Sequence, residues 1–123
     1  MSRIEELLER GVKIAAPGSV EIGDEVDPGR IAPGVVIHAG CKVFGASTSI
    51  GPGCVLGREA SASVEDCQLG EGVHLKGGYF SGAVFLDGAA MGSGAQVRAG
   101  TILEEGAEMA HTVGLKQTIQ PQA

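Results

Sequence analysis

Large apolar residues recur at every sixth position along the last part of the chain. Each of five six-residue units opens on one of them, at Met91, Val97, Leu103, Met109 and Leu115. The fifth place of each unit holds a small or branched residue, namely Ala95, Thr101, Ala107, Val113 and Ile119. A period of six fits neither a helical stripe of period 3.6 nor the alternation of a long strand. Repeats of short strands joined by tight corners do fit it. The pattern therefore predicts a parallel β-helix in which three units form the three sides of each coil.

The same spacing continues upstream, with small changes of phase. It begins at Ile31, slips by one residue before Ile50, and slips again before Ser63. An irregular side is expected over residues 79–84, after which Phe85 restores the phase. Grouped in threes, these units predict an all-β fold of about five to six coils, each adding about 4.7–4.9 Å of height. The β-helix is expected over residues 31–119, followed by a tail over residues 120–123.

The first thirty residues differ from the repeat. Ser2 and Glu5 have the spacing of a capping box, and Gly11 supplies a stop, so we expect a short helix within residues 1–11. Such a helix would cover the exposed first coil, because solenoid ends need covers; docking of a partner is the alternative. Residues 12–30 alternate loosely between two Pro-Gly turns, which predicts an irregular first coil.

Composition narrows the possible partners. The 123 residues include 21 Gly, one Tyr, three Phe and no Trp, and the net charge is −6. A solenoid tolerates this composition, since it buries a narrow aliphatic column and uses Gly at its corners. The negative charge argues against nucleic acid or an anionic membrane surface as a partner. No apolar run approaches the roughly 18 residues of a membrane span, so none is expected.

The cysteines and histidines offer little chemistry. Cys41, Cys54 and Cys67 lie 13 residues apart, each in the fifth place of a unit, and we expect three reduced, buried core thiols. Reduced thiols indicate a reducing compartment, the cytoplasm. The alternative to a core role is that one of these cysteines is a catalytic thiol. The three histidines, His38, His74 and His111, occupy different places in their units, so we expect no metal site; a zinc site is the alternative.

Arg98 and Lys116 are the candidate binding residues. Each follows a unit-opening apolar residue, and they lie 18 residues apart, so they should occupy one corner on successive coils, about 5 Å apart. Like charges at that distance repel unless an anion lies between them, and phosphate suits both side chains. The alternative is that both point into water or pair with the carboxylates of Glu104, Glu105 or Glu108. Tyr79 and Phe80 are expected to stack at the irregular side, with ligand contact as the alternative.

Several segments resemble a known family in order along the chain. They are Ile4 to Ile14, the Pro17-Gly-Ser-Val segment, Ile50-Gly-Pro-Gly-Cys-Val-Leu-Gly and Val97-Arg-Ala-Gly-Thr-Ile-Leu-Glu-Glu-Gly-Ala. Together they resemble the acetyltransferase half of the bacterial bifunctional N-acetylglucosamine-1-phosphate uridyltransferase/glucosamine-1-phosphate acetyltransferase. The resemblance implies a left-handed coil, a trimer, and sites for acetyl-CoA and a sugar phosphate between subunits. It also implies that Arg98 and Lys116 hold the phosphorylated sugar.

The chain departs from this family in three respects. The run Ala110 to Lys116 replaces a Gly-Asn-Phe-Val-Glu-Val-Lys type of segment. The family's catalytic histidine would fall beyond Ala123, and its uridyltransferase half has no counterpart here. We therefore name no catalytic residue and expect these residues alone to be inactive, because acyl transfer needs its general base. Two hypotheses stay open: a sugar-phosphate-binding domain related to UDP-N-acetylglucosamine biosynthesis, or a non-catalytic trimeric scaffold.

Overall fold

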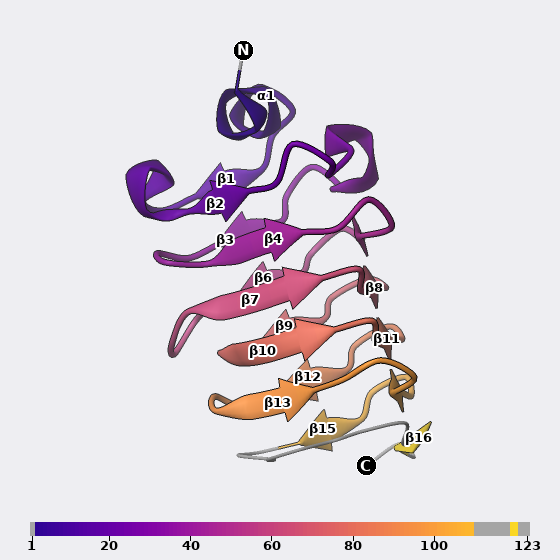
Figure 1. Ribbon diagram of the computed structural model, residues 1–123. Coiled ribbons are helices and arrows are strands. Elements are labelled where there is room, and N and C mark those ends of the chain that lie inside the picture. Colours follow the sequence, from indigo (N-terminus) through magenta and orange to yellow (C-terminus); the bar gives the residue numbers. More distant parts are fainter. Residues whose placement is uncertain (1, 110–118, 121–123) are drawn as a thin grey trace.

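Three parallel sheets wind around one axis. The structure, a computed structural model, describes residues 2–109 and 119–120 (Figure 1). The first sheet contains, in spatial order, β1 (Lys13–Ile14), β3 (Val36–Ile37), β6 (Val55–Leu56), β9 (His74–Leu75), β12 (Ala90–Met91) and β15 (Glu108–Met109). The second contains β2 (Glu21–Ile22), β4 (Lys42–Phe44), β7 (Ala62–Glu65), β10 (Gly78–Ser81) and β13 (Ala95–Val97). The third contains β5 (Ser49–Ile50), β8 (Gln68–Leu69), β11 (Val84–Phe85), β14 (Ile102–Leu103) and β16 (Ile119–Gln120).

The chain visits the three sheets in turn, as the period of six predicts. Four turns are complete, from β3 to β14, and each contributes one strand to every sheet. The predicted five to six coils is therefore slightly too many. In the first turn, two short 3-10 helices, Pro17–Ser19 and Pro28–Arg30, replace regular structure, and the third side is a single bridge from Ile31 to Ile50. In the last turn only β15 and β16 are described, and Gln120, expected to open the tail, lies in β16.

The coil is left-handed, as the family resemblance implied. In Figure 1 the chain crosses the front of the molecule from left to right along β4, β7, β10 and β13, returns behind them, and descends from the N-terminus. Crossovers between parallel strands are right-handed in most other folds. The hexapeptide pattern thus predicts the hand only through its resemblance to known sequences, since the spacing itself fits either hand.

One apolar column fills the axis. Every unit-opening residue from Ile31 onward whose side chain is described is buried, with the exception of Ser63. Phe80 and Phe85, the largest buried side chains, contact each other edge to face with centroids 5.7 Å apart. The core is therefore the continuous aliphatic column that the repeat predicts, with two aromatic rings at its middle.

Two details of the predicted phase are wrong. Val64 fills the core where Ser63 was expected, and Ser63 lies on the outer face beside Lys42 and Tyr79. The side expected to be irregular contains β10, a regular strand that pairs with β7 over four residues. Tyr79 and Phe80 also do not stack together, because Phe80 points into the core and Tyr79 is 48% exposed.

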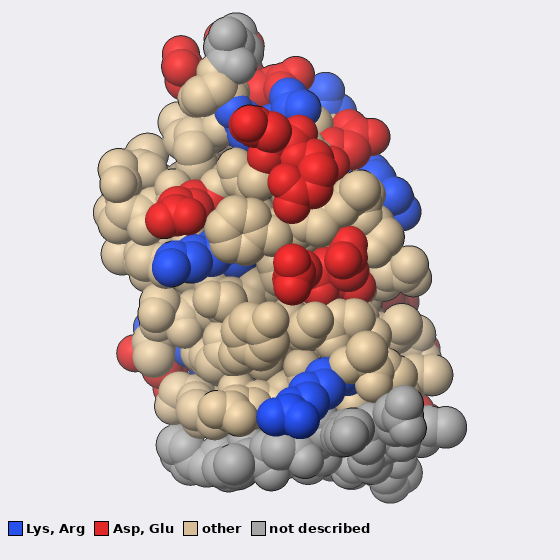
Figure 2. All heavy atoms as spheres, in the orientation of Figure 1, with Lys and Arg blue, Asp and Glu red and all other residues tan. Residues whose placement is uncertain are grey.

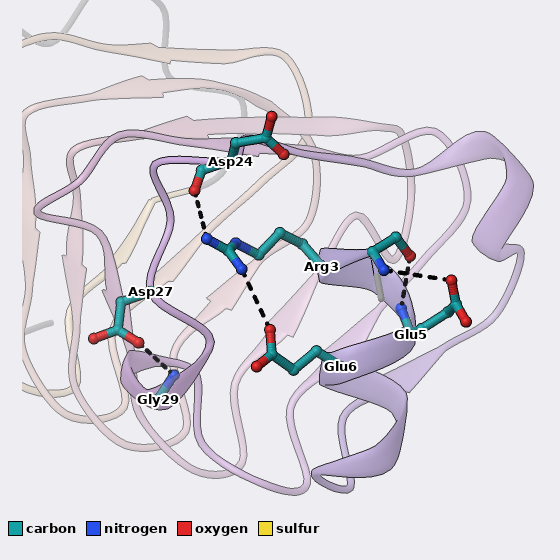
Figure 3. Close-up of polar contacts among 7 residues, drawn as sticks. Arg3, Glu5, Glu6, Asp24, Asp27 and Gly29 are labelled. Atoms are coloured by element: carbon teal, nitrogen blue, oxygen red, sulfur yellow. Dashed lines mark hydrogen bonds and ion pairs between the residues drawn. The ribbon is translucent and has the colours of Figure 1, made fainter.

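A short helix covers the first coil. It spans Arg3–Glu9 (α1), and Ser2 and Glu5 form the predicted capping box. Leu7 belongs to this helix and is fully buried, which stabilises the fold by about 1.5–3 kcal/mol relative to an exposed side chain. Arg3 joins the helix to the next segment by donating a 2.8 Å hydrogen bond to the carbonyl oxygen of Asp24 (Figure 3). No helix in the described part of the chain is long and apolar enough to cross a membrane.

Candidate functional site

Arg98 lies at the corner that follows β13. The strand alternates between core and surface: Ala95 and Val97 are buried, whereas Gln96 and Arg98 are exposed. The chain then turns, with the backbone N–H of Thr101 donating a 3.4 Å hydrogen bond to the carbonyl oxygen of Arg98. The alternation holds the backbone of Arg98 in place while its guanidinium extends into solvent, which is the geometry expected of a ligand-binding cation.

The strand register identifies the neighbours of Arg98. Val97 pairs with Phe80, so the next position along the strand places Arg98 beside Ser81. Ser81 pairs in turn with Glu65, two coils away from Arg98. Two coils correspond to about 9–10 Å between backbones, a distance over which salt screens exposed charges strongly. At this register position, the preceding coil, which the structure describes, therefore provides Arg98 with a hydroxyl group and no carboxylate.

Arg98 forms no ion pair with Glu104 or Glu105. The single salt bridge among the described residues joins Arg3 to Glu6, at 3.4 Å. Among the described residues neither carboxylate neutralises Arg98, which leaves for this side chain the alternative in which it points into water; the side chain of Glu108 lies outside the described part. Arg98 is also the only Lys or Arg between Lys76 and Lys116. In the view of Figure 2, Lys and Arg atoms lie low on the drawn face, apart from the acidic groups that gather nearer the N-terminus.

Lys116 lies outside the described residues, so its stacking on Arg98 stays a prediction. The prediction assumes that one coil contains 18 residues at this corner. Strand pairs before and after the corner give the coil length there. Ala90 pairs with Glu108, 18 positions further on, but Ile102 pairs with Ile119, only 17 further on. The separation of 18 residues between Arg98 and Lys116 thus matches the coil length before this corner and not the one after it.

The described histidines lie in different columns. His74 pairs with Val55, which pairs with Val36, whereas His38 comes two residues after Val36. They are therefore two coils apart and offset along the strand direction, as their places in the repeat predict. His111 lies outside the described residues, and within the described part no three metal-ligating side chains gather.

All three cysteines are fully buried free thiols, as expected. Burial raises the pKa of each thiol, and that of Cys67 reaches about 11. The thiol of Cys54 donates a 2.9 Å hydrogen bond to the carbonyl oxygen of Gly70. A buried thiol that stays protonated is a poor nucleophile, so these residues serve the core and not catalysis.

Acidic side chains at the corners bind backbone amides of adjacent coils. Glu25 accepts a 2.7 Å hydrogen bond from the N–H of Gly45, which lowers the pKa of Glu25. Asp66 accepts 3.2 Å and 2.9 Å hydrogen bonds from the N–H and hydroxyl of Ser47. Asp87 accepts a 2.8 Å bond from the N–H of Glu71. Part of the chain's negative charge therefore has a structural role, because it satisfies corner amides that the sheets leave unpaired.

An open groove separates α1 from the upper part of the second sheet. Its volume is about 420 Å³, and its lining includes Arg3, Ile22, Asp24 and Phe44. Figure 3 shows Arg3 already engaged there, with its guanidinium between Asp24 and Glu6. The groove thus lies several coils from Arg98, and its arginine is already bonded to the Glu6 carboxylate and to the backbone carbonyl of Asp24.

Tyr79 is the exposed residue that the sequence interpretation misplaced. It lies on the outer face of β10, in register with Ser63 on one side and Gln96 on the other. A usable signal exists in the alternation of Tyr79, Phe80 and Ser81, since a buried Phe80 requires both neighbours to point outward.

Comparisons with known proteins connect this architecture to a family. The chain is 34% identical over 113 residues to the "Bifunctional protein GlmU" of Oleidesulfovibrio alaskensis, covering 91% of this chain and 23% of that protein. The protein of the same name from Thermotoga petrophila is 31% identical over 118 residues, covering 96% and 25%. The chain thus spans about a quarter of the length of these relatives. No protein-family model matches it.

Proposed function

We propose a function from the premise that this chain is a hexapeptide-repeat, transferase-related domain homologous to part of the GlmU proteins. The corner at Arg98 binds the phosphate of a phosphorylated sugar, with glucosamine-1-phosphate as the first ligand to test. The observation that supports this most is an exposed arginine without an ion pair to a described residue, in a chain of net charge −6. Guanidinium groups bind phosphate through paired hydrogen bonds, which a charge left unpaired by its own protein can supply.

Lys116 is the proposed second cation of this site. A lysine adds a mobile point charge to the planar donors of the arginine, so that both can contact one phosphate. Acetyl-CoA is the acyl donor that the family resemblance implies. We expect no acetyl transfer by these 123 residues alone, because none of them is assigned the role of general base.

The domain acts as a homo-oligomer, with a trimer as the proposed state. Two of its three outer faces carry apolar side chains that are only partly buried: Val36, Val55 and Ala90 on the first sheet, and Val84 and Ile102 on the third. Packing these faces against sister chains would add the burial that a small solenoid lacks by itself. Light scattering should report about three times the chain mass of 12.4 kDa; a monomer would contradict this proposal.

Calorimetric titration tests the ligand. Glucosamine-1-phosphate should bind the unmutated chain saturably, and R98A and K116A should each weaken binding. R58A is the matched control, since Arg58 is an exposed arginine at a different corner and should leave binding unchanged. If the unmutated chain shows no saturable binding, the ligand proposal fails and the non-catalytic scaffold remains. The three reduced core thiols support a reducing compartment such as the cytoplasm as the setting for either role.

A further inference from the structure

The outer face of the second sheet carries a grid of polar side chains around one aromatic ring. Alternation turns two residues of β7 and of β10 outward and one residue of β13, and Arg98 directly follows β13. Register aligns Ser63, Tyr79 and Gln96 in one row across the strands. The next outward positions place Arg98 beside Ser81. Tyr79 therefore has a hydroxyl group on one coil, an amide on the next, and the guanidinium of Arg98 diagonally across.

This face differs in kind from the other two. The outward residues of the first and third sheets include partly buried aliphatic side chains, namely Val36, Val55, Ala90, Val84 and Ile102, beside the polar Lys13, His74, Ser49 and Gln68. Those of the second sheet below β4 are Ser63 and Glu65 of β7, Tyr79 and Ser81 of β10, and Gln96 of β13, all able to form hydrogen bonds. The carboxylate among them, Glu65, pairs in register with Ser81 and lies two coils from Arg98. Aliphatic faces suit burial against protein, whereas a polar face with a single ring suits a small polar ligand.

Tyr79 is half exposed and makes no ring contact with another aromatic residue of the described part. It remains 48% exposed, and the aromatic contact on this coil is made by Phe80 with Phe85. Among the described residues, only Leu8 and Leu86 are large apolar side chains of comparable exposure, and both lie away from this sheet. An exposed aromatic ring beside hydrogen-bonding groups is the chemistry that recognises sugars. The C–H bonds on one side of a pyranose contact the electron-rich ring face, and the hydroxyl groups bind the polar neighbours.

We propose that Tyr79, with Ser63, Ser81 and Gln96 around it, is the platform for the sugar ring of a hexose phosphate whose phosphate binds Arg98. Diagonal neighbours on adjacent strands lie about 7–8 Å apart, a separation that a hexose and its phosphate can bridge. This inference rests on the proposed function, because Arg98 is the same residue in both. Beyond the phosphate site, Tyr79 contacts the sugar ring, and the ligand lies on the outer face of the second sheet.

The chain contains its own reporter for this contact. Tyr79 is the only tyrosine and there is no tryptophan, so the tyrosine emission of the protein comes from this ring. Glucosamine-1-phosphate should change the emission saturably and protect the ring from quenching by acrylamide. Inorganic phosphate should bind at Arg98 and leave the quenching unchanged. Equal quenching of Tyr79 with and without bound glucosamine-1-phosphate would overturn the platform.

Variants separate the sugar contact from the phosphate contact. Y79A should weaken glucosamine-1-phosphate binding about 2- to 12-fold, the range expected for an aromatic contact, and leave inorganic phosphate binding unchanged. Y79F should retain most of the affinity, and R98A should weaken both ligands. L86A is the control, an exposed large side chain removed from a different corner.

Each outcome decides between the two proposals. Equal affinities of Y79A and the unmutated chain for glucosamine-1-phosphate would overturn the platform while the phosphate site at Arg98 stands. If Y79A weakens the binding of both ligands equally, the platform is also overturned, because a ring that contacts only the sugar cannot change the affinity for inorganic phosphate. If neither ligand binds the unmutated chain, the proposed function and the platform fall together. Matching thermal melts of all variants would exclude misfolding as the cause of a loss.

Discussion

Substituting Gly78 by alanine tests whether the coils stack as closely as the strand register requires. Gly78 opens β10 with φ +120° and lies between Ala62 and Ala95 of the adjacent coils. A Cβ added here would collide with the carbonyl oxygen of Ala95 and come within 2.9 Å of its backbone nitrogen. Backbone atoms of a paired strand cannot move aside as a flexible side chain could, so the two coils would have to separate.

Gly94 is a matched control in the next coil. It also has a positive φ, of +81°, but an added Cβ would meet nothing within 4 Å. Alanine at either site incurs about 1–2 kcal/mol for the left-handed backbone, partly offset by about 0.4–1 kcal/mol from a less flexible unfolded chain. Gly78→Ala adds an overpacking cost of about 1–3 kcal/mol. We therefore expect a loss of about 2–4 kcal/mol for Gly78→Ala and about 1 kcal/mol for Gly94→Ala.

Urea and thermal unfolding followed by circular dichroism measure the difference. At about 4 °C per kcal/mol for a domain of this size, Gly78→Ala should melt roughly 8–16 °C lower and Gly94→Ala only a few degrees lower. Equal losses for the two variants would refute the reasoning, because they would mean that only the backbone angle matters. Coils that separate freely at β10 would be inconsistent with the register described here.

Three further predictions concern the core, the thiols and a corner carboxylate. Phe80→Ala should destabilise the fold by about 3–5 kcal/mol in urea unfolding, whereas Tyr79→Ala should change it by less than about 0.5 kcal/mol, since only Phe80 is buried. The three thiols should resist a thiol-specific reagent at pH 8 until the protein unfolds, because burial raises their pKa; rapid labelling of the folded chain would contradict this. Glu25 has a lowered pKa in the folded state, so its stabilising effect is present above its unfolded pKa and is lost as the pH falls through the folded pKa. The free energy of unfolding of Glu25→Gln, measured in urea at a series of pH values, should therefore fall less steeply with acidification than that of the unmutated chain.

The sequence predicts the column of core residues better than the lengths of the corners. Six-residue steps locate the buried positions wherever corners have uniform length, as from Phe85 to Leu103. The steps fail where a corner is longer or shorter, because loop residues carry no apolar period. Leu56 and Val64 are eight positions apart, and the extra residues form a loop in which the N–H groups of Glu59 and Ala60 both donate to the carbonyl oxygen of Lys76.

The shortened corner lies next to the lengthened one. Leu75 and Phe80 are only five positions apart, and Gly77 lies in that corner so close to Ala60 that an added Cβ would approach the methyl group of Ala60 to 2.9 Å. The loop of one coil therefore occupies space that the next coil leaves free. This compensation involves residues on different coils, which explains why no local pattern in the sequence predicts it.

The same corners determine which face Tyr79 occupies. A shift of one residue in a strand exchanges its inner and outer side chains, so an error in corner length changes the assignment of every residue in that strand. If the side after Leu75 is irregular, the repeat does not determine whether Tyr79 and Phe80 face inward or outward, and the stacking of the two expected from the sequence does not occur. With the corner at its true length, Phe80 enters the core beside Phe85, and Tyr79 must face outward in register with Gln96. The corner occupied by Gly77 therefore links the packing of the core to the exposure of the ring proposed to bind sugar. A variant that lengthened this corner by one residue should turn Tyr79 inward and abolish both its exposure to acrylamide and its response to the ligand.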